Sequence, residues 1–290
     1  MTPESAQLTV LAGGGTLPLE LADHLERSGI AFRMIAFREF ASRALRAKAD
    51  AVVPLLDLPA IKALLTRYET PGVSLVGQVH RPNAAALLSA YTLFRNYRYV
   101  KDVISKGDDN LLRGAVSILE EWGHSVVGVH ELMPDIMAPR GVLGRRHPNE
   151  DDRRAIQTGF ELIRALSPYD VGQAVALTGE RVLAVEGPEG TDRMLDRVRV
   201  VQNRRLSFAK PVLRGALVKG PKKGQDLRVD MPAIGPKTVI KANKAGLNGV
   251  AVAAGFTLII DRERTVAEAD KLGLYLIGYD PEDNTPEQEP

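Results

Sequence analysis

The stretch Leu8–Arg27, LTVLAGGGTLPLELADHLER, indicates the fold class of this chain. Its first part, Leu8–Ala12, is mostly apolar and typical of a buried strand in a parallel sheet, whereas the apolar residues of Leu17–Arg27 recur at helical spacing. The glycines between them permit a tight turn, and a strand, a turn and a helix N-terminus together form a ready site for an anion. We therefore predict an α/β domain, with four candidate substrate-binding residues in the turn: Gly13, Gly14, Gly15 and Thr16.

The same glycines match the dinucleotide-binding fingerprint only in part. Gly13 and Gly15 fit its first two glycines, but Pro18 stands where the third belongs. The next predicted strand, Ala31–Phe37, continues into Arg38 rather than into a clean acidic ligand for a ribose. A nicotinamide-dependent oxidoreductase is therefore a weakly supported alternative, and a plain tight turn explains the glycines equally well.

Strand and helix patterns alternate beyond this stretch, which favours a Rossmann-like parallel sheet with ligands beyond the carboxyl ends of its strands. The pattern lapses between Met133 and Glu150, where three prolines and two glycines are typical of a linker. We predict an N-terminal Rossmann-like domain over 1–132, a linker over 133–150, a C-terminal α/β catalytic domain over 151–280 and a disordered acidic tail over 281–290. We expect the ligand cleft between the two domains.

Composition excludes several classes of function. The 290 residues are 44% hydrophobic and 26% charged, as in soluble globular proteins, and they include no cysteine, which excludes thiol nucleophiles, disulfides and Cys-ligated zinc. A net charge of +2 is too small to predict a nucleic-acid partner. No secretory signal is expected at the N-terminus, and the longest apolar passage, Leu247–Ile260, is too short to span a bilayer. Any membrane contact is therefore expected to be peripheral.

The segment Arg214–Thr238, RGALVKGPKKGQDLRVDMPAIGPKT, has the composition of a site for phosphoryl chemistry. Gly220 and Gly224 let the backbone approach a ligand closely. Asp226 and Asp230 are carboxylates four residues apart, and Mg²⁺ binds through one or two carboxylates together with waters and phosphate oxygens. The cationic candidates for holding a phosphate are Lys219, Lys222, Lys223 and Arg228. A solvated surface loop would have a similar composition, so the residues alone leave both interpretations open.

A second acidic, glycine-containing loop, Val185–Asp192, follows a predicted hairpin. Glu186 is a candidate metal ligand there, although Thr191 or Asp192 would equally serve as a helix cap. The remaining candidates for substrate binding are Arg81, Lys106, Gln225 and Asn248.

Six blocks of the sequence resemble the two-domain family of UDP-2,3-diacylglucosamine pyrophosphatases of lipid A synthesis, as distinct from the metallophosphoesterase-like form of that activity. The blocks cover Ala12–Ala22, Lys106–Gly114, Asp170–Val175, Ala184–Asp192, Lys219–Thr238 and Gly246–Gly255. They occur in the family's order along nearly the whole chain, and we find no departure from the family pattern within them.

The resemblance implies Mg²⁺-dependent hydrolysis of UDP-2,3-diacylglucosamine to lipid X and UMP, with water attacking the phosphorus nearer uridine. It implies that the essential aspartate of the KKGQDL motif is Asp226. We hypothesise that Asp226 binds Mg²⁺ or orients the attacking water, assisted by Asp230 or Glu186. The expected partners are the lipid substrate and product, at the cytoplasmic face of the inner membrane and peripherally bound, with no nucleic acid; a homodimer is also considered.

One further alternative is a non-catalytic module that binds anions or nucleic acid through the lysine-rich segment. It predicts steeply salt-dependent binding of polyanions without metal-dependent turnover. The near-neutral net charge and the lack of an aromatic stacking platform count against it. Release of UMP from a UDP-sugar lipid would separate the hydrolase from both alternatives.

Overall fold

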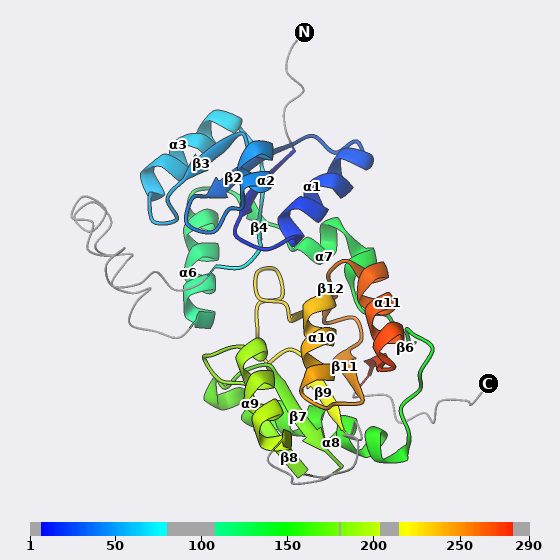
Figure 1. Cartoon of the computed structure of the whole chain (residues 1–290). Coiled ribbons are helices and arrows are strands. Elements are labelled where there is room, and N and C mark those ends of the chain that lie inside the picture. The colour runs from blue at the N-terminus through cyan, green and yellow to red at the C-terminus, as the bar shows by residue number, and fades with distance from the viewer. Residues whose placement is uncertain (1–6, 80–107, 180, 204–214, 281–290) are drawn as a thin grey trace. The chain divides into compact units, whose positions relative to one another are not determined.

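The computed structural model describes residues 7–79, 108–179, 181–203 and 215–280, and the chain divides into two compact units that we describe separately (Figure 1). Unit 1 comprises Met1–Pro134 together with Asp226–Asp230, and unit 2 comprises Asp135–Gln225 and Met231–Pro290. Two candidate site residues, Arg81 and Lys106, and the predicted acidic tail lie outside the described residues.

Unit 1 has the parallel sheet predicted from the alternating pattern. Its strand order is β3-β2-β1-β4-β5, and every neighbouring pair is parallel. The strands are β1 (Leu8–Ala12), β2 (Phe32–Phe37), β3 (Ala51–Val53), β4 (Gly72–Val76) and β5 (Ser125–Val126). The helices are α1 (Leu17–Arg27), α2 (Arg43–Lys48), α3 (Leu58–Tyr68), α6 (Asp108–Glu121) and α7 (Val129–Leu132). The Rossmann-like prediction for this part of the chain is confirmed.

Strand β1 lies at the point where the strand order reverses. Leu8 pairs with Phe32 of β2 on one side and with Gly72 of β4 on the other. Ligands of open α/β sheets bind beyond the carboxyl ends of the strands at such a point. The turn Gly13–Gly15 follows β1 directly and therefore lies at this position.

Helices α3 and α6 cover one face of this sheet, and Figure 1 shows α1 on the other. Leu11 and Ile35 of the sheet pack with Leu65 of α3 and Leu119 of α6. Each such side chain contributes roughly 1.5–3 kcal/mol to folding when it is fully buried. Val229, which belongs to the segment Asp226–Asp230, packs against the same cluster.

Unit 2 contains a mixed sheet of order β6-β13-β11-β9-β7-β8, in which β9, β11 and β13 are parallel and β6, β7 and β8 pair antiparallel to their neighbours. The strands are β6 (Gly141–Val142), β7 (Ala174–Thr178), β8 (Arg181–Val185), β9 (Ala216–Lys219), β11 (Gly249–Ala253) and β13 (Tyr275–Tyr279). A separate pair is formed by β10 (Ala233–Ile234) and β12 (Leu258–Ile259). The helices are α8 (Glu150–Leu166), α9 (Thr191–Asn203), α10 (Pro236–Lys244) and α11 (Arg262–Leu272), with 3-10 turns η1 (Pro134–Ile136) and η2 (Ser167–Tyr169).

Apolar side chains cover both faces of the unit 2 sheet. Helix α8 packs on one face through Ile156 and Phe160, whereas α9, α10 and α11 pack on the other. Gly159 of α8 makes close approach possible, because a Cβ there would lie 2.6 Å from a methyl carbon of Val218. The segment 133–150, expected as a linker, supplies the edge strand β6 to this sheet.

None of the helices in the described part of the chain is both long enough and apolar enough to cross a membrane.

Candidate active site

The lysine-rich segment changes from one unit to the other twice, after Gln225 and after Asp230. Lys219 to Gln225 belong to unit 2, and Asp226 to Asp230 belong to unit 1. The carboxylate expected to be essential is therefore packed in a different unit from the lysines that precede it. The local sequence contains no signal for this division.

In unit 1, the residues after Asp226 form a compact turn around its carbonyl and carboxylate. The main-chain N–H groups of Val229 and Asp230 donate to the carbonyl oxygen of Asp226 at 3.2 and 2.9 Å. The main-chain N–H of Arg228 donates to Oδ1 of Asp226 at 3.1 Å. Such a bond from residue i+2 to an aspartate side chain stabilises a turn in place of a helix or strand.

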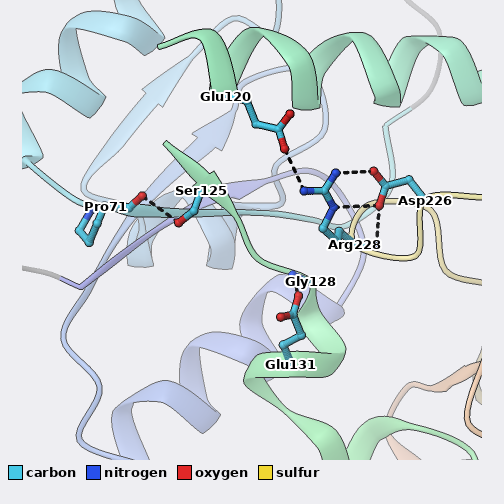
Figure 2. Close-up of polar contacts among 7 residues, drawn as sticks. All are labelled: Pro71, Glu120, Ser125, Gly128, Glu131, Asp226 and Arg228. Atoms are coloured by element: carbon cyan, nitrogen blue, oxygen red, sulfur yellow. Dashed lines mark hydrogen bonds and ion pairs between the residues drawn. The ribbon is translucent and has the colours of Figure 1, made fainter. Parts of the chain in front are cut away.

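The guanidinium of Arg228 binds the carboxylate of Asp226 through two N–H donors. Nε donates to Oδ1 at 3.0 Å and Nη2 donates to Oδ2 at 2.8 Å, while Nη1 donates to Oε1 of Glu120 at 2.9 Å (Figure 2). Glu120 lies near the end of α6, 108 residues earlier in the chain. Two parallel N–H···O bonds fix both the distance and the plane of a carboxylate, as lysine could not.

This environment keeps Asp226 ionised. Hydrogen bonds from Arg228 lower the pKa of the carboxyl below its ordinary value despite partial burial, and the charge of Arg113 acts in the same direction. The hydrogen bonds to Asp226 and Glu120 raise the pKa of Arg228, so the guanidinium stays protonated. At neutral pH Asp226 is thus a carboxylate that accepts hydrogen bonds and does not donate a proton.

The turn that holds Asp226 docks at the end of strand β5. A Cβ on Gly128 would lie 3.1 Å from Cα of Arg228 and 2.4 Å from Cε1 of His130, so glycine is what allows the two backbones to come together. The main-chain N–H of Gly128 donates to Oε1 of Glu131 at 2.7 Å (Figure 2). With Val229 in the apolar cluster, these contacts place the segment at the carboxyl edge of the sheet, where α/β folds bind ligands.

The glycine turn after β1 packs against the loop after β4. The main-chain N–H of Gly14 donates to the carbonyl of Gln78 at 2.8 Å, and the N–H of Gln78 donates back at 2.9 Å. A Cβ on Gly13 would lie 2.7 Å from the same carbonyl oxygen. Close packing of two loops is therefore one reason for glycine here. Thr16 precedes α1 and is exposed, and its side chain makes no capping hydrogen bond.

In unit 2, three candidate lysines lie at or just after the end of strand β9 and are held in different ways. Lys219 ends the strand and is buried, and its ammonium donates to Oγ1 of Thr191 at 2.8 Å. Lys222 donates through Nζ to Oδ1 of Asp170 at 2.5 Å, and its main-chain N–H donates to Oε1 of Gln225 at 3.0 Å. Lys223 is exposed.

Asn248 lies elsewhere in the same unit. It precedes β11, and the register of β9 and β11 puts it at the opposite end of the sheet from Lys219. Its side chain is buried and donates to Oδ1 of Asp152 at 3.0 Å. The structure therefore does not bring Asn248 to the edge where Lys219 lies, and shows it bonded within the core.

Two of the three carboxylates proposed as metal ligands, Glu186 and Asp226, accept hydrogen bonds from protein donors. Glu186 accepts from the main-chain N–H of Gln173 at 3.1 Å and from the hydroxyl of Thr191 at 2.8 Å. Asp226 accepts three bonds from Arg228. Within the described ranges, no group of three or more His, Asp or Glu side chains is arranged to hold a metal ion.

Sequence reasoning missed several residues that the structure brings to these candidates. Arg113 lies in the block Lys106–Gly114, which resembles the family, so the sequence drew attention to this region. The effect of its charge on the pKa of Asp226 could not be inferred from the spacing of the residues. Glu120 has no local signal, because it resembles any exposed helical glutamate. Thr191 was expected only as a cap, whereas its hydroxyl joins Lys219 to Glu186.

Comparison with known proteins gives the chain its family. Residues 7–136 match the model of the LpxI N-terminal domain, and residues 139–277 match that of the LpxI C-terminal domain. The chain belongs to the LpxI family. The family predicted from the six sequence blocks is thereby confirmed.

A curated LpxI relative covers almost the whole chain. The UDP-2,3-diacylglucosamine pyrophosphatase LpxI of Caulobacter vibrioides is 37% identical over 277 residues, which is 96% of this chain and 99% of the relative.

Similarities to solved structures are low. The enzyme WbmG of Bordetella bronchiseptica, in complex with NAD and UDP, matches 94% of this chain and 97% of its own with 10% identity and a TM-score of 0.30. The biotin carboxylase domain of Hydrogenobacter thermophilus 2-oxoglutarate carboxylase matches 68% of this chain with 11% identity and a TM-score of 0.25, and the match spans 40% of that chain. Likenesses this distant do not bear on function.

Proposed function

We propose that this chain hydrolyses the pyrophosphate of UDP-2,3-diacylglucosamine in lipid A synthesis and releases lipid X and UMP. The observation that carries the proposal is the 37% identity, over 96% of the chain, to a pyrophosphatase with this substrate in its name. As a member of this family the chain is a hydrolase acting on a pyrophosphate bond.

The proposed reaction is a single displacement at the phosphorus nearer uridine. The water oxygen forms a bond to this phosphorus, and the bond from phosphorus to the bridging oxygen breaks. The bridging oxygen leaves on the sugar phosphate, which becomes lipid X, and the water supplies the new oxygen of UMP and releases a proton. Such reactions depend chiefly on positioning and on neutralising the charge of the phosphates.

Asp226 is the proposed catalytic residue, and its environment supports a defined role. It is held ionised and oriented by Arg228, so one of its oxygens can accept a hydrogen bond from the attacking water. Arg228 is itself a donor suited to phosphate, as are the lysines of the same segment. We propose Gly13–Thr16, Arg81, Lys106 and Gln225 as further substrate-binding residues, as their types and motifs predict.

We include dependence on Mg²⁺ in the proposal. When bound, the ion neutralises phosphate charge and polarises the phosphorus. Asp226 and Asp230 are the carboxylates of the segment, and Mg²⁺ usually keeps waters and phosphate oxygens among its ligands. Because the described residues form no preassembled cluster, we assign the ion no step beyond this.

The test is an assay of the purified protein with UDP-2,3-diacylglucosamine and Mg²⁺ in isotopically labelled water, followed by phosphorus NMR and mass spectrometry. We expect equal amounts of UMP and lipid X, with the heavy oxygen in UMP. Label in lipid X would place the attack on the other phosphorus. Absence of both products, or turnover that depends on NAD(P), would overturn the proposed function.

The substrate also suggests where the protein works. A sugar lipid with two acyl chains resides in a membrane, so we propose a cytoplasmic protein that associates peripherally with the inner membrane. Sedimentation with lipid vesicles that contain the substrate, compared with vesicles without it, tests this association. Equal recovery in the supernatant with both kinds of vesicle would contradict it.

A further inference from the structure

Three segments that are far apart in the sequence meet at one edge of the unit 2 sheet. Lys219 is the last residue of β9, Glu186 directly follows β8, and Thr191 is the first residue of α9. The pairing of β7 with both strands explains the meeting: Ala174 of β7 pairs with Lys219, and its carbonyl accepts from the main-chain N–H of Glu186 at 2.8 Å.

A directed chain of hydrogen bonds joins the three side chains. The carboxylate of Glu186 accepts from the hydroxyl of Thr191 at 2.8 Å, so the single hydroxyl proton is used in this bond. The oxygen of Thr191 is left to accept from Nζ of Lys219, at 2.8 Å. The other oxygen of Glu186 accepts from the main-chain N–H of Gln173 at 3.1 Å, which holds the carboxylate in place.

Gly172 makes the anchoring of Glu186 possible. Its main-chain N–H donates to the carbonyl oxygen of Glu186 at 3.0 Å. A Cβ at this position would lie 2.5 Å from both Cβ and Cγ of Glu186, which is closer than real Cβ atoms come. Any larger residue would therefore displace the carboxylate that orients Thr191.

The charge of Lys219 is the feature that points to a ligand. The residue is only 9% exposed, and no carboxylate in the described parts of the chain forms an ion pair with its ammonium. An ammonium has three N–H donors, and the hydroxyl of Thr191 takes one of them. The carboxylate of Glu186 is reached only through the hydroxyl of Thr191, so the ammonium has no direct charge partner, and an anion would supply one.

We infer that Thr191 and Glu186 are positioning residues that hold the ammonium of Lys219 for a phosphate group of the substrate. This inference rests on the proposed function, deepens it, and gives Glu186 a different role from that of a metal ligand. The hydroxyl of Thr191 orients the ammonium of Lys219, the carboxylate of Glu186 orients that hydroxyl, and the ammonium donates to a phosphate oxygen. The site takes a phosphate as part of a nucleotide or of a sugar phosphate.

Substitution of Lys219 separates a ligand-binding role from a structural one. Lys219→Met removes the buried charge, which has no direct ion pair, and keeps most of the apolar stem. We expect the ligand-free variant to unfold at the same temperature as the wild type or higher, while affinity for UMP, lipid X or both falls by about tenfold to a hundredfold. Lys244→Met, an exposed lysine of α10, is the matched control and should change neither. A lower unfolding temperature with unchanged affinities would overturn the inference.

Substitution of Thr191 tests the positioning role. Thr191→Val keeps the shape and removes the hydroxyl, so KM for UDP-2,3-diacylglucosamine should rise by about tenfold, whereas Thr191→Ser should restore the wild-type value. Gly172→Ala should resemble Thr191→Val in its effect on KM, because it displaces Glu186. Equal KM values for Thr191→Val and Thr191→Ser would contradict the inference.

The two proposals fail in different ways. If the wild type does not hydrolyse UDP-2,3-diacylglucosamine, the proposed function is wrong. If the wild type does so but Lys219→Met binds UMP and lipid X as tightly as Lys244→Met, only the phosphate site is wrong.

Discussion

Arg228 holds Asp226 by two side-chain hydrogen bonds at once, from Nε to Oδ1 at 3.0 Å and from Nη2 to Oδ2 at 2.8 Å. The pair lies within five residues that fold with unit 1, and the third nitrogen of the guanidinium donates to Glu120 (Figure 2). The carboxylate is thus pre-oriented and charged before any substrate arrives, as preorganised catalytic groups are.

Replacing Asp226 should abolish most of the activity without unfolding the protein. Asp226→Asn keeps the size of the side chain and removes the charge, so turnover is expected to fall by about two to four orders of magnitude. Because the residue is half-buried in a turn, the thermal unfolding temperature should change little. UMP release measures the first effect and calorimetry the second. Asp135→Asn, at an exposed aspartate, is the control, and near wild-type turnover of Asp226→Asn would refute the assignment.

Glu120 should matter through Arg228 and less than Asp226 does. Glu120→Gln removes one charged partner of the guanidinium and leaves the two bonds to Asp226, so we expect turnover to fall only several-fold. The loss in unfolding free energy should stay below about 1 kcal/mol, since the pair is about half-exposed. Urea unfolding and steady-state kinetics measure both. The neighbouring exposed Glu121→Gln is the matched control, and identical kinetics for the two variants would show that Glu120 has no role.

The lowered pKa of Asp226 predicts the pH dependence of its contribution to stability. The folded pKa lies below the unfolded value of about 3.9, so the stabilisation is complete above that pH and is lost as pH falls through the folded pKa. Arg228→Met removes the cause of the shift. The wild type should therefore be more stable than this variant by about 1 kcal/mol at neutral pH, given partial exposure of the pair, and the difference should shrink below about pH 4. Urea unfolding at several pH values measures it; a difference that grows in acid would contradict the assigned shift.

Gly77 should be intolerant of any side chain. Its φ is +101°, and a Cβ would lie 2.6 Å from the carbonyl oxygen of Gly14 and 2.8 Å from Cγ of Pro18. We expect Gly77→Ala to lower the free energy of unfolding by more than about 2 kcal/mol, because backbone strain and overlap add. Gly29→Ala has a similar positive φ, +68°, but no atom within 4 Å, and should cost only about 1 kcal/mol. Equal losses of unfolding free energy for Gly77→Ala and Gly29→Ala would contradict this prediction, because they would show that the turn after β1 and the loop after β4 separate easily.

Metal removal should affect activity and not folding. Chelation is expected to abolish turnover, because the proposed reaction depends on Mg²⁺. It should leave the unfolding temperature of the ligand-free protein nearly unchanged, because the described residues contain no cluster of three ligating side chains. Added Mg²⁺ should restore turnover. A marked fall in unfolding temperature on chelation would indicate a structural metal, and full turnover in the chelator would exclude metal dependence.

Local sequence patterns predicted most of the elements that carry the fold. The apolar run Leu8–Ala12 and the helical spacing of Leu17–Arg27 correspond residue for residue to β1 and α1, because strand and helix periodicities depend on neighbouring residues. The position of Asn248 shows the limit of this reasoning. Its motif suggested a site residue, yet it is bonded to Asp152 in the core, 96 residues away.

Residue type, order and short-range spacing were enough to establish the α/β class, the chemistry of the lysine-rich segment and membership of the LpxI family. Three further features became visible only in the folded chain: Asp226 folds with unit 1, Glu120 from 108 positions away accepts from Arg228, and Thr191 joins Lys219 to Glu186. These partners are selected by the strand order and by close backbone contacts at glycines. Periodicity specifies which side chains are buried, but not which distant segment each of them meets.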